Sequence, residues 1–361
     1  MILPNPHVAA MDAYALADLS APPGKPLIAL CQNESLRPAS PNVADAAAKA
    51  IRDQQLYPDP NWTALREEVA SVHDIDASSI LCGNGSLDLI GCLARAYLKT
   101  GDAAVAPAHA YPFFRTATLA TGARFDIAPE RDLTVDVDAL IGAVTSKTRM
   151  VFVANPGNPT GTRIPRADLV RLRNTLADDV MLVIDEAYGE FADHLNEPYF
   201  DLVNRGNTVV LRTFSKAYGL AGARVGWGLF PPAIAGEVRK LLNPNNVSAV
   251  SQVSALAALG DQAYLRETCA MTATLRETLS TQIGALGLEV AHSFTNFALI
   301  RFGSLHAAQS ADRFLRAEGV FLRPQGGAGL PDCLRATIGV ADEMALTVRL
   351  LKNWMKSEGL A

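Results

Sequence analysis

Short apolar runs alternate with helix-like patterns through most of this chain, and that alternation restricts the fold. Strands are expected near residues 79–83, 103–107, 149–154, 180–185 and 208–213, with helices near 63–73, 86–98 and 165–177. Such an order predicts an α/β protein with a largely parallel sheet and helices on both faces. The chain has 361 residues, and at about 150 residues per domain this length predicts two domains.

The pattern changes after about residue 245. A long helix is indicated by apolar residues at near-helical spacing, namely Leu265, Cys269, Leu275, Leu279 and Ile283. Short strands are expected near 296–302, 320–323 and 333–338, and a closing helix carries a stripe of Leu346, Leu350, Leu351 and Trp354. We expect an N-terminal arm over 1–35 that joins the small domain, a large domain over 36–245, and a smaller α+β domain over 246–361. A substrate site is expected in the cleft between the domains.

One segment places a lysine on a turn of small residues. Lys216 lies within 213–224, which reads Thr-Phe-Ser-Lys-Ala-Tyr-Gly-Leu-Ala-Gly-Ala-Arg, so that Arg224 follows eight positions later. A lysine amine is nucleophilic when burial or a nearby cation lowers its pKa, and it can then hold an aldehyde cofactor as a Schiff base. Taken alone, the segment is more typical of a polar surface turn with an exposed lysine and arginine.

Two strand ends carry polar residues of the same character. An apolar run over 149–154 leads into Asn155-Pro-Gly-Asn158-Pro-Thr-Gly161, and a second run, 180–184, ends at Asp185 and is followed by Tyr188. Polar groups gather at the carboxyl ends of parallel strands, and a buried carboxylate there requires a cation or hydrogen-bond donors. A protonated pyridine nitrogen would pair with Asp185 and keep the ring an electron sink, while Asn158 and Tyr188 could donate to a ring phenolate oxygen.

With these segments together, the chain resembles the fold-type I pyridoxal-phosphate enzymes of the class I/II aminotransferases, and most closely the histidinol-phosphate aminotransferase family. The resemblance runs from about Tyr14 to the last helix. The residues that carry it occur in the family's order: Asn158, Asp185, Tyr188, Ser215, Lys216 and Arg224. It implies that Lys216 is the Schiff-base lysine and proton shuttle and that Asp185 pairs with the pyridine nitrogen. Asn158 and Tyr188 would bind the phenolate oxygen, and Ser215 and Arg224 the cofactor phosphate.

Two further segments fit the same cofactor, pyridoxal 5'-phosphate. A strand over 80–83 runs through a glycine-rich turn into an apolar helix, where backbone amides favour a phosphate. The resemblance assigns the phosphate cup to Gly85, Ser86 and Leu87; a dinucleotide fingerprint is the competing reading, but Asp88 stands where its third glycine would be. Tyr111 matches the aromatic residue that stacks on the cofactor ring, although an aromatic cluster at a helix start is otherwise typical of core.

Arginines in the C-terminal part predict an anionic substrate group. Arg335 lies in the middle of a strand and Arg323 follows another apolar run; a guanidinium fork suits carboxylate or phosphate. The resemblance makes these two the substrate clamp and adds Tyr14 and Asn33 to the substrate-binding residues. It also matches Tyr57 to a tyrosine that reaches the cofactor phosphate of the neighbouring subunit, which requires a homodimer. The alternative for Tyr57 is an ordinary turn aromatic.

The chain departs from its resembled family at two places. The usual Asn-Glu-Asn-Pro segment with a following Gly-Pro-Ser-Pro is replaced by Asn33-Glu-Ser-Leu-Arg-Pro-Ala-Ser-Pro41, and a Pro-aromatic-Asn-Val turn is replaced by Pro244-Asn-Asn-Val247. Both lie near the substrate side of the cleft in relatives, so they bear on imidazole specificity. Neither touches the cofactor chemistry.

Bulk properties predict a cytoplasmic enzyme without nucleic-acid or membrane partners. The net charge is −5, with no basic run, and no apolar stretch approaches the roughly 18 residues needed to cross a bilayer. The start lacks the basic region of a signal peptide. Five cysteines without a Cys-x-x-Cys pair and six scattered histidines predict neither a disulfide framework nor a metal site.

The function expected from this sequence is that of an amino-acid biosynthesis aminotransferase with a ping-pong mechanism. L-histidinol phosphate is the first hypothesis for the donor and 2-oxoglutarate for the acceptor. An aromatic or other α-amino acid donor is the close alternative. A decarboxylase, lyase or oxidase also stays open, because the cofactor stabilises any carbanion and the protein selects which bond breaks. A cofactor-binding regulator lacks sequence support, since no DNA-binding extension precedes Tyr14.

Overall fold

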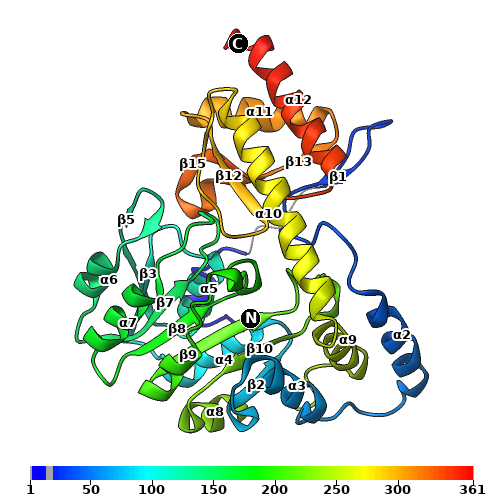
Figure 1. The fold of residues 1–361 in the computed structure, drawn as a ribbon. Coiled ribbons are helices and arrows are strands. Elements are labelled where there is room, and N and C mark those ends of the chain that lie inside the picture. Colours follow the sequence, from blue (N-terminus) through cyan, green and yellow to red (C-terminus); the bar gives the residue numbers. More distant parts are fainter. Residues whose placement is uncertain (1, 14–18, 361) are drawn as a thin grey trace.

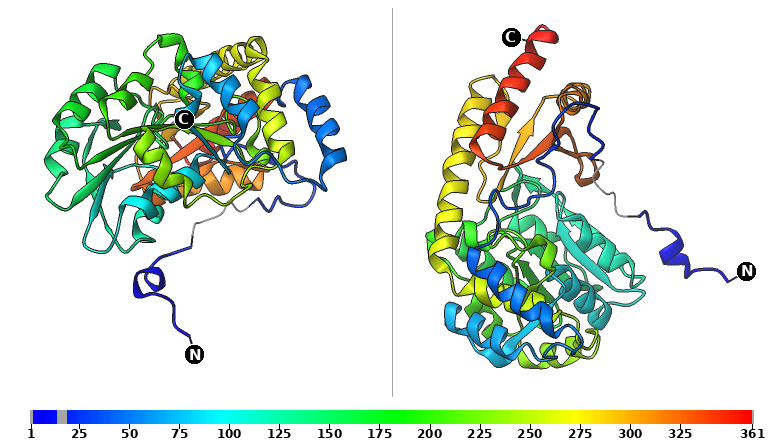
Figure 2. Two further views of the ribbon diagram at one scale, coloured as in Figure 1. Left: turned by 90° about the horizontal axis from the view of Figure 1, so that it is seen from below. Right: turned by 90° about the vertical axis from the view of Figure 1, so that its right-hand side faces the viewer.

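The structure, a computed structural model, describes residues 2–13 and 19–360 and has two packed parts (Figure 1). The larger part surrounds a seven-stranded sheet, and the smaller part contains a four-stranded sheet. The long helix α10 (Gln262–Gly284) runs from one part to the other. An N-terminal segment with the short helix α1 (Pro6–Ala9) extends away from the body of the molecule (Figure 2). Tyr14, predicted to bind substrate, lies outside the described residues.

The large sheet confirms the predicted α/β fold. Its strand order is β2-β10-β9-β8-β7-β3-β4. The bounds are β2 (Ile80–Gly83), β10 (Gly226–Leu229), β9 (Thr208–Thr213), β8 (Met181–Asp185), β7 (Thr148–Ala154), β3 (Ala103–Pro107) and β4 (Arg124–Ala128). Pairs from β9 to β4 are parallel, and β10 alone is antiparallel to both of its neighbours. Every residue of β8 is buried, as its continuous apolar sequence predicts for a central strand.

Helices pack around this sheet and against one another (Figures 1 and 2). They are α2 (Pro41–Ala50), α3 (Thr63–His73), α4 (Ser86–Tyr97), α5 (Pro112–Leu119), α6 (Val137–Ala143), α7 (Arg166–Thr175), α8 (Pro232–Arg239) and α9 (Ala249–Leu259). A two-stranded ribbon of β5 (Glu130–Arg131) and β6 (Thr134–Val135) stands beside them. The helices expected near 63–73, 86–98 and 165–177 are α3, α4 and α7.

The smaller part is built on an antiparallel sheet in the order β11-β12-β15-β14. Its strands are β11 (Glu289–Val290), β12 (Phe297–Arg301), β15 (Leu330–Thr337) and β14 (Arg323–Gln325), and its helices are α11 (Leu305–Ala317) and α12 (Ala341–Ser357). The single strand expected over 320–323 is instead divided at Leu322. Its first residues form β13 (Val320–Phe321), whereas Arg323 begins β14 and pairs with β15.

The N-terminal segment returns to the smaller part through one short pairing. β1 (Ile28–Ala29) runs parallel to β13, with Ile28 opposite Val320. The next residue, Leu30, is buried in the core of the smaller part, which is separate from the core around the large sheet. Helix α9 belongs to the first core, although it follows the predicted boundary at 245. The two cores agree with a division into two parts, and the domain boundaries at 35 and 245 stay predictions.

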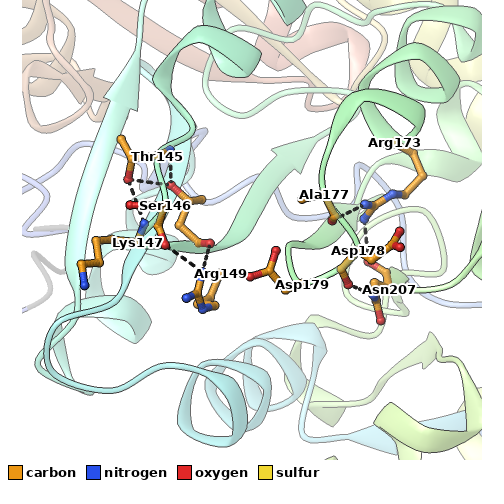
Figure 3. Close-up of polar contacts among 10 residues, drawn as sticks. Thr145, Ser146, Lys147, Arg149, Arg173, Ala177, Asp178, Asp179 and Asn207 are labelled. Atoms are coloured by element: carbon orange, nitrogen blue, oxygen red, sulfur yellow. Dashed lines mark hydrogen bonds and ion pairs between the residues drawn. The ribbon is translucent and has the colours of Figure 1, made fainter.

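Polar contacts close the amino ends of the central strands (Figure 3). The guanidinium of Arg173 donates to the backbone oxygens of Leu176, Ala177, Val180 and Asn207. Arg149, on β7, forms an ion pair with Asp179 at 3.3 Å, just before β8. The functional side chains lie at the opposite, carboxyl edge of the same strands.

Candidate active site

A cavity of about 610 Å³ lies at the carboxyl edge of the large sheet and brings most of the predicted residues together. Its lining includes Ser86, Leu87, Tyr111, Asn158, Asp185, Tyr188, Ser215, Lys216, Arg224, Asn33, Arg323 and Arg335. These residues come from the large sheet, from the N-terminal segment and from the smaller part. The cavity is therefore the cleft that the sequence predicts between two domains.

Lys216 follows β9 by three residues and points at the N-terminal segment. Its Nζ atom donates to the backbone oxygen of Gln32 at 3.2 Å and lies 5.9 Å from the ring centre of Tyr188. Burial, assisted by the cationic Arg335, lowers the pKa of Lys216 to about 8. A substantial fraction of the amine is therefore neutral near physiological pH, which is the state in which an amine attacks an aldehyde.

Asp185 is the last residue of β8 and is buried at the cavity floor. Its carboxylate accepts one hydrogen bond from the Ala187 N–H at 3.1 Å. Burial raises the pKa of Asp185 to about 7, and the neighbouring carboxylate of Glu186 adds to the rise, whereas Lys216 opposes it. A cation placed against this carboxylate would recover the energy that burial costs.

The hydroxyl of Tyr188 is the centre of a hydrogen-bond network. It accepts from the side-chain amide of Asn33 at 2.7 Å and from that of Asn158 at 3.3 Å. Arg335 in turn donates to the Asn158 oxygen at 2.5 Å and to the backbone oxygen of Cys31 at 3.0 Å. The predicted phenolate-binding pair and the predicted anion-binding arginine therefore touch one another directly.

The amino end of α4 forms a cradle with the Arg224 side chain. Gly85 precedes the helix at φ 79°, which favours glycine, and a Cβ atom there would lie 2.7 Å from the Arg224 Nη2 atom and displace the guanidinium. Arg224 also donates to the Ser215 hydroxyl at 3.3 Å. No side chain caps α4 at Gly85, which leaves its first N–H groups directed at a ligand. This donor set fits a phosphate dianion.

Three predicted residues lie at or beyond the margin of the cavity. Tyr111 is the residue before α5 and lines it, as predicted for a ring-stacking aromatic. Arg323 also lines it, whereas Tyr57 is 87% exposed and does not reach the cavity of its own chain. Asn246 belongs to the segment 244–247, where the sequence departs from the family pattern. Its side chain accepts from the Trp62 indole and donates to the Cys82 carbonyl, and it does not line the cavity.

Sequence reasoning missed the residues that hold the N-terminal segment over the site. The backbone oxygens of Cys31 and Gln32, the hydroxyl of Thr337 and the amide of Asn296 all bond within this network. Backbone groups leave no trace in a side-chain pattern, and Asn296 and Thr337 are far from residue 33 in the chain. A single sequence offers no signal that would have found them.

A second chamber of about 730 Å³ adjoins the cavity and shares part of its wall, namely Cys31, Tyr111, Thr116, Asn158, Arg323 and Arg335. Its other lining includes Arg115 and Arg316. In the described part of the chain, no group of three or more His, Cys, Asp or Glu side chains is arranged to hold a metal. Nor is any described helix long and apolar enough to cross a membrane.

Comparisons with known proteins agree with this geometry. The model of the family "Aminotransferase class I and II" matches residues 25–348. Histidinol-phosphate aminotransferases of Rhodospirillum rubrum and Paramagnetospirillum magneticum are each 39% identical, over 99% and 98% of this chain and 98% of each relative. The Sinorhizobium meliloti histidinol-phosphate aminotransferase, solved in complex with pyridoxal-5'-phosphate, superposes with TM-score 0.91 at 30% identity, covering 98% of this chain and 97% of that one.

The fold and the site thus define an aminotransferase of fold type I. The chain belongs to the aminotransferase class I and II family, and within it to the histidinol-phosphate aminotransferase family that it matches over nearly its full length. A Thermus thermophilus aspartate aminotransferase, at 19% identity and TM-score 0.84, shares the fold. The predicted family, fold and enzyme class are confirmed. The Gly85 cradle and the buried Asp185 both fit pyridoxal phosphate.

Proposed function

We propose that this aminotransferase uses pyridoxal 5'-phosphate to move the amino group of L-histidinol phosphate to a 2-oxo acid such as 2-oxoglutarate. The observation that carries the donor assignment is the arginine pair Arg323 and Arg335, which both line the cavity, with Arg335 donating to the cofactor-side residue Asn158. A guanidinium fork pairs well with a phosphate dianion. The relatives that match over the full length bear the same donor in their names.

Each cavity residue has a role in this proposal. Bound pyridoxal phosphate supplies an aldehyde and a protonated ring that withdraws electrons from the reacting carbon. Gly85, Ser86, Leu87, Ser215 and Arg224 would hold its phosphate. Asp185 would keep the ring nitrogen protonated, because an adjacent anion favours the cationic form. Asn158 and Tyr188 would bind the ring oxygen, Tyr111 would stack on the ring, and Lys216 would carry a proton to and from the donor's α-carbon.

The same arginines also suit a carboxylate, so an aromatic or other α-amino acid is the rival donor. The test is a half-reaction without acceptor, in which loss of cofactor absorbance is followed with histidinol phosphate and, separately, with phenylalanine. We expect the phosphate ester to react at least about tenfold more efficiently, the factor that about 1.4 kcal/mol of selective binding provides. A preference for phenylalanine would overturn the donor assignment. Release of carbon dioxide or ammonia would overturn amino transfer itself.

Two variants test the chemistry. Lys216→Ala should abolish turnover and the visible band of the bound cofactor. Asp185→Asn should keep much of the cofactor and lose roughly 100-fold or more in rate, because the ring nitrogen loses its charge partner. Wild-type rates in either variant would refute the corresponding role.

We also propose a homodimer in the cytoplasm. Tyr57 is 87% exposed, and two apolar residues shortly before it in the chain, Leu56 at 64% and Ile51 at 57%, are also exposed and available for a second subunit. All five cysteines are free thiols, which supports a reducing compartment. Light scattering should give the mass of two chains. Tyr57→Phe should then weaken cofactor binding while the mass stays unchanged, and a monomer at micromolar concentration would exclude this role.

A further inference from the structure

Three successive residues of the N-terminal segment each hold one functional group of the site. The Cys31 oxygen accepts from Arg335 at 3.0 Å, and the Gln32 oxygen accepts from the Lys216 amine at 3.2 Å. The Asn33 side chain then donates to the Tyr188 hydroxyl at 2.7 Å. The position of residues 31–33 therefore affects the anion site, the amine and the tyrosine together.

The hydroxyl of Thr337, the last residue of β15, fixes the Asn33 end of this segment. Its oxygen accepts from the Asn33 backbone N–H at 2.9 Å and lies 3.3 Å from the Asn33 side-chain oxygen, to which its own proton is donated. Thr337 is buried, so these bonds do not compete with water. The Thr337 N–H also donates to the Leu30 oxygen at 2.9 Å, which keeps the two chains side by side.

The Thr337 hydroxyl accepts from the Asn33 backbone N–H and donates to the Asn33 side-chain oxygen. This second bond determines which way the side-chain amide of Asn33 points. With its oxygen turned to Thr337, the amide directs its NH₂ group at Tyr188. Asn33 sits at φ 55°, a left-handed conformation that asparagine tolerates better than most residues and that needs external support. Further support comes from Asn296, whose side-chain NH₂ donates to the backbone oxygens of Asn33 at 3.1 Å and Glu34 at 3.0 Å.

We propose that Thr337 is a positioning residue: it orients Asn33 and, through Asn33, sets the hydrogen bond that Tyr188 presents to the cofactor. Thr337 lies two residues after Arg335 on β15, so both side chains project from the same face of that strand. One strand of the smaller part therefore carries the anion-binding arginine and the group that sets the tyrosine. The consequence for catalysis rests on the proposed function, but the hydrogen bonds themselves do not.

The test compares Thr337→Val, which keeps the shape but has no hydroxyl, with Thr337→Ser, which keeps the hydroxyl. Thr347→Val is the matched control, because the hydroxyl of that buried threonine on α12 donates to the Glu343 backbone oxygen of its own helix. In the cofactor-free proteins, amide hydrogen exchange is measured in a peptide that contains residues 31–34. Thr337→Val should speed this exchange at least about tenfold, and Thr337→Ser and Thr347→Val should not, because only the first opens the local structure.

With cofactor bound, Thr337→Val should also raise the pH midpoint of the visible absorption, because the ring oxygen loses an oriented donor, and Thr337→Ser should restore it. With a working donor, kcat should fall about tenfold while KM changes less than about threefold. A merely structural role would lower thermal stability in both valine variants and leave the absorption midpoint unchanged. That result would overturn the proposal.

A second variant covers the case in which Thr337→Val fails to fold. Asn33→Ala leaves the Thr337 hydroxyl in place but removes the side chain through which it acts, so this variant should by itself raise the absorption midpoint as Thr337→Val is expected to do. An unchanged midpoint in Asn33→Ala would show that Asn33 does not set the hydrogen bond of Tyr188 and would overturn the proposal. If histidinol phosphate is not a donor, exchange and absorption still decide this inference, so the two failures are distinguishable.

Discussion

At the scale of single residues, burial moves the two central ionisable groups of the site toward neutrality. It lowers the pKa of Lys216 to about 8 and raises the pKa of Asp185 to about 7. Each shift prepares a group for the cofactor: the amine becomes nucleophilic, and the carboxyl gains most from a cation placed beside it. The sequence indicated both residues from motif and strand end, but the strength of the effect depends on neighbours such as Arg335 that only the fold brings close.

The state of the Lys216 amine can be measured without cofactor or substrate. Competitive acylation with acetic anhydride, followed by peptide mass spectrometry, measures how fast Lys216 is labelled at each pH. The labelling rate should rise with a midpoint at about pH 8, because only the neutral amine reacts. Arg335→Met removes a nearby cation and should move that midpoint upward. Arg313→Met, on an exposed position of α11, is the control and should leave it unchanged. A midpoint unaffected by the loss of Arg335 would contradict the electrostatic cause.

His73 predicts a loss of stability in mild acid. Its ring packs against Phe200 and Trp227, and no described residue bonds its Nε2 atom. Burial lowers the pKa of His73 to about 3, and Arg212 adds to the effect. In the unfolded chain the His73 ring is protonated below about pH 6.5. Between about pH 6.5 and about pH 3 the unfolded chain therefore binds more protons than the folded protein. The free energy of unfolding should therefore decrease as the pH is lowered, by up to about 2 kcal/mol at about pH 5.

The measurement is urea unfolding at about pH 7 and about pH 5. His73→Phe keeps a flat ring in the aromatic cluster and should lose this part of the pH dependence. His306→Phe, at an exposed position of α11, should keep it. Equal pH dependence in the two variants would show that other groups cause the acid sensitivity.

At the scale of elements, the strands that carry the site were predictable because their sequences are extreme. β7, β8 and β9 are buried along almost their whole length, and polar residues stand at or just after their carboxyl ends, so an apolar run followed by a turn places Asn158, Asp185 and Lys216 at one edge. The reversal of β10 was not predictable, because an antiparallel strand between parallel ones has the same apolar content. The β1–β13 pairing, with two residues on each strand, is too short to leave a pattern.

The C-terminal end of α7 gives a prediction about stability rather than catalysis. Arg173→Met keeps the aliphatic stem but removes the guanidinium donors to the oxygens of Leu176, Ala177, Val180 and Asn207. The Ala177 and Asn207 oxygens keep backbone N–H donors, whereas the oxygens of Leu176 and Val180 lose the guanidinium. Buried acceptors that lose a donor are costly, so the free energy of unfolding should fall by about 3 kcal/mol. Denaturant unfolding measures this loss, and kcat should stay unchanged because Arg173 lies at the opposite edge of the sheet from Lys216.

Arg171→Met is the matched control on the same helix. Arg171 is exposed and pairs with Asp138 on the surface, so its loss should cost far less stability than the loss of Arg173. Similar losses in the two variants would mean that the buried hydrogen bonds of Arg173 contribute no more than a surface ion pair.

At the scale of the whole molecule, the site exists only where its two packed parts and the N-terminal segment meet. Lys216 and Tyr188 come from the large sheet, Arg335 from the smaller part, and Asn33 from the N-terminal segment. The chamber beside the site is rich in positive charge, whereas the whole molecule is negative. The chain carries a net charge of −5, yet the chamber next to the site is lined by Arg115, Arg316, Arg323 and Arg335, with Asp12 as the one acidic residue among its described lining.

Arg115 lies in no sequence motif that would identify it as a functional residue. Only the fold places it beside the site. It lies one helical turn after Tyr111 on α5 and faces the same chamber. No described residue forms a hydrogen bond or ion pair with its guanidinium, which lies 6.0 Å from the Phe125 ring centre. We expect Arg115→Met to lower kcat/KM for histidinol phosphate about threefold to tenfold through KM, because an exposed cation near an anion-binding cleft raises the local anion concentration. The chemical step, and so kcat, should not change.

Salt separates this long-range effect from a direct contact. Raising the salt to about 1 M shrinks the screening length to about 3 Å, so the difference between Arg115→Met and the wild-type enzyme should nearly vanish. Arg313→Met again serves as the control, since Arg313 lines neither chamber and should show no difference at any salt concentration. If the Arg115 effect persists at high salt, the guanidinium binds the phosphate directly, and the outer chamber belongs to the binding site rather than to the approach.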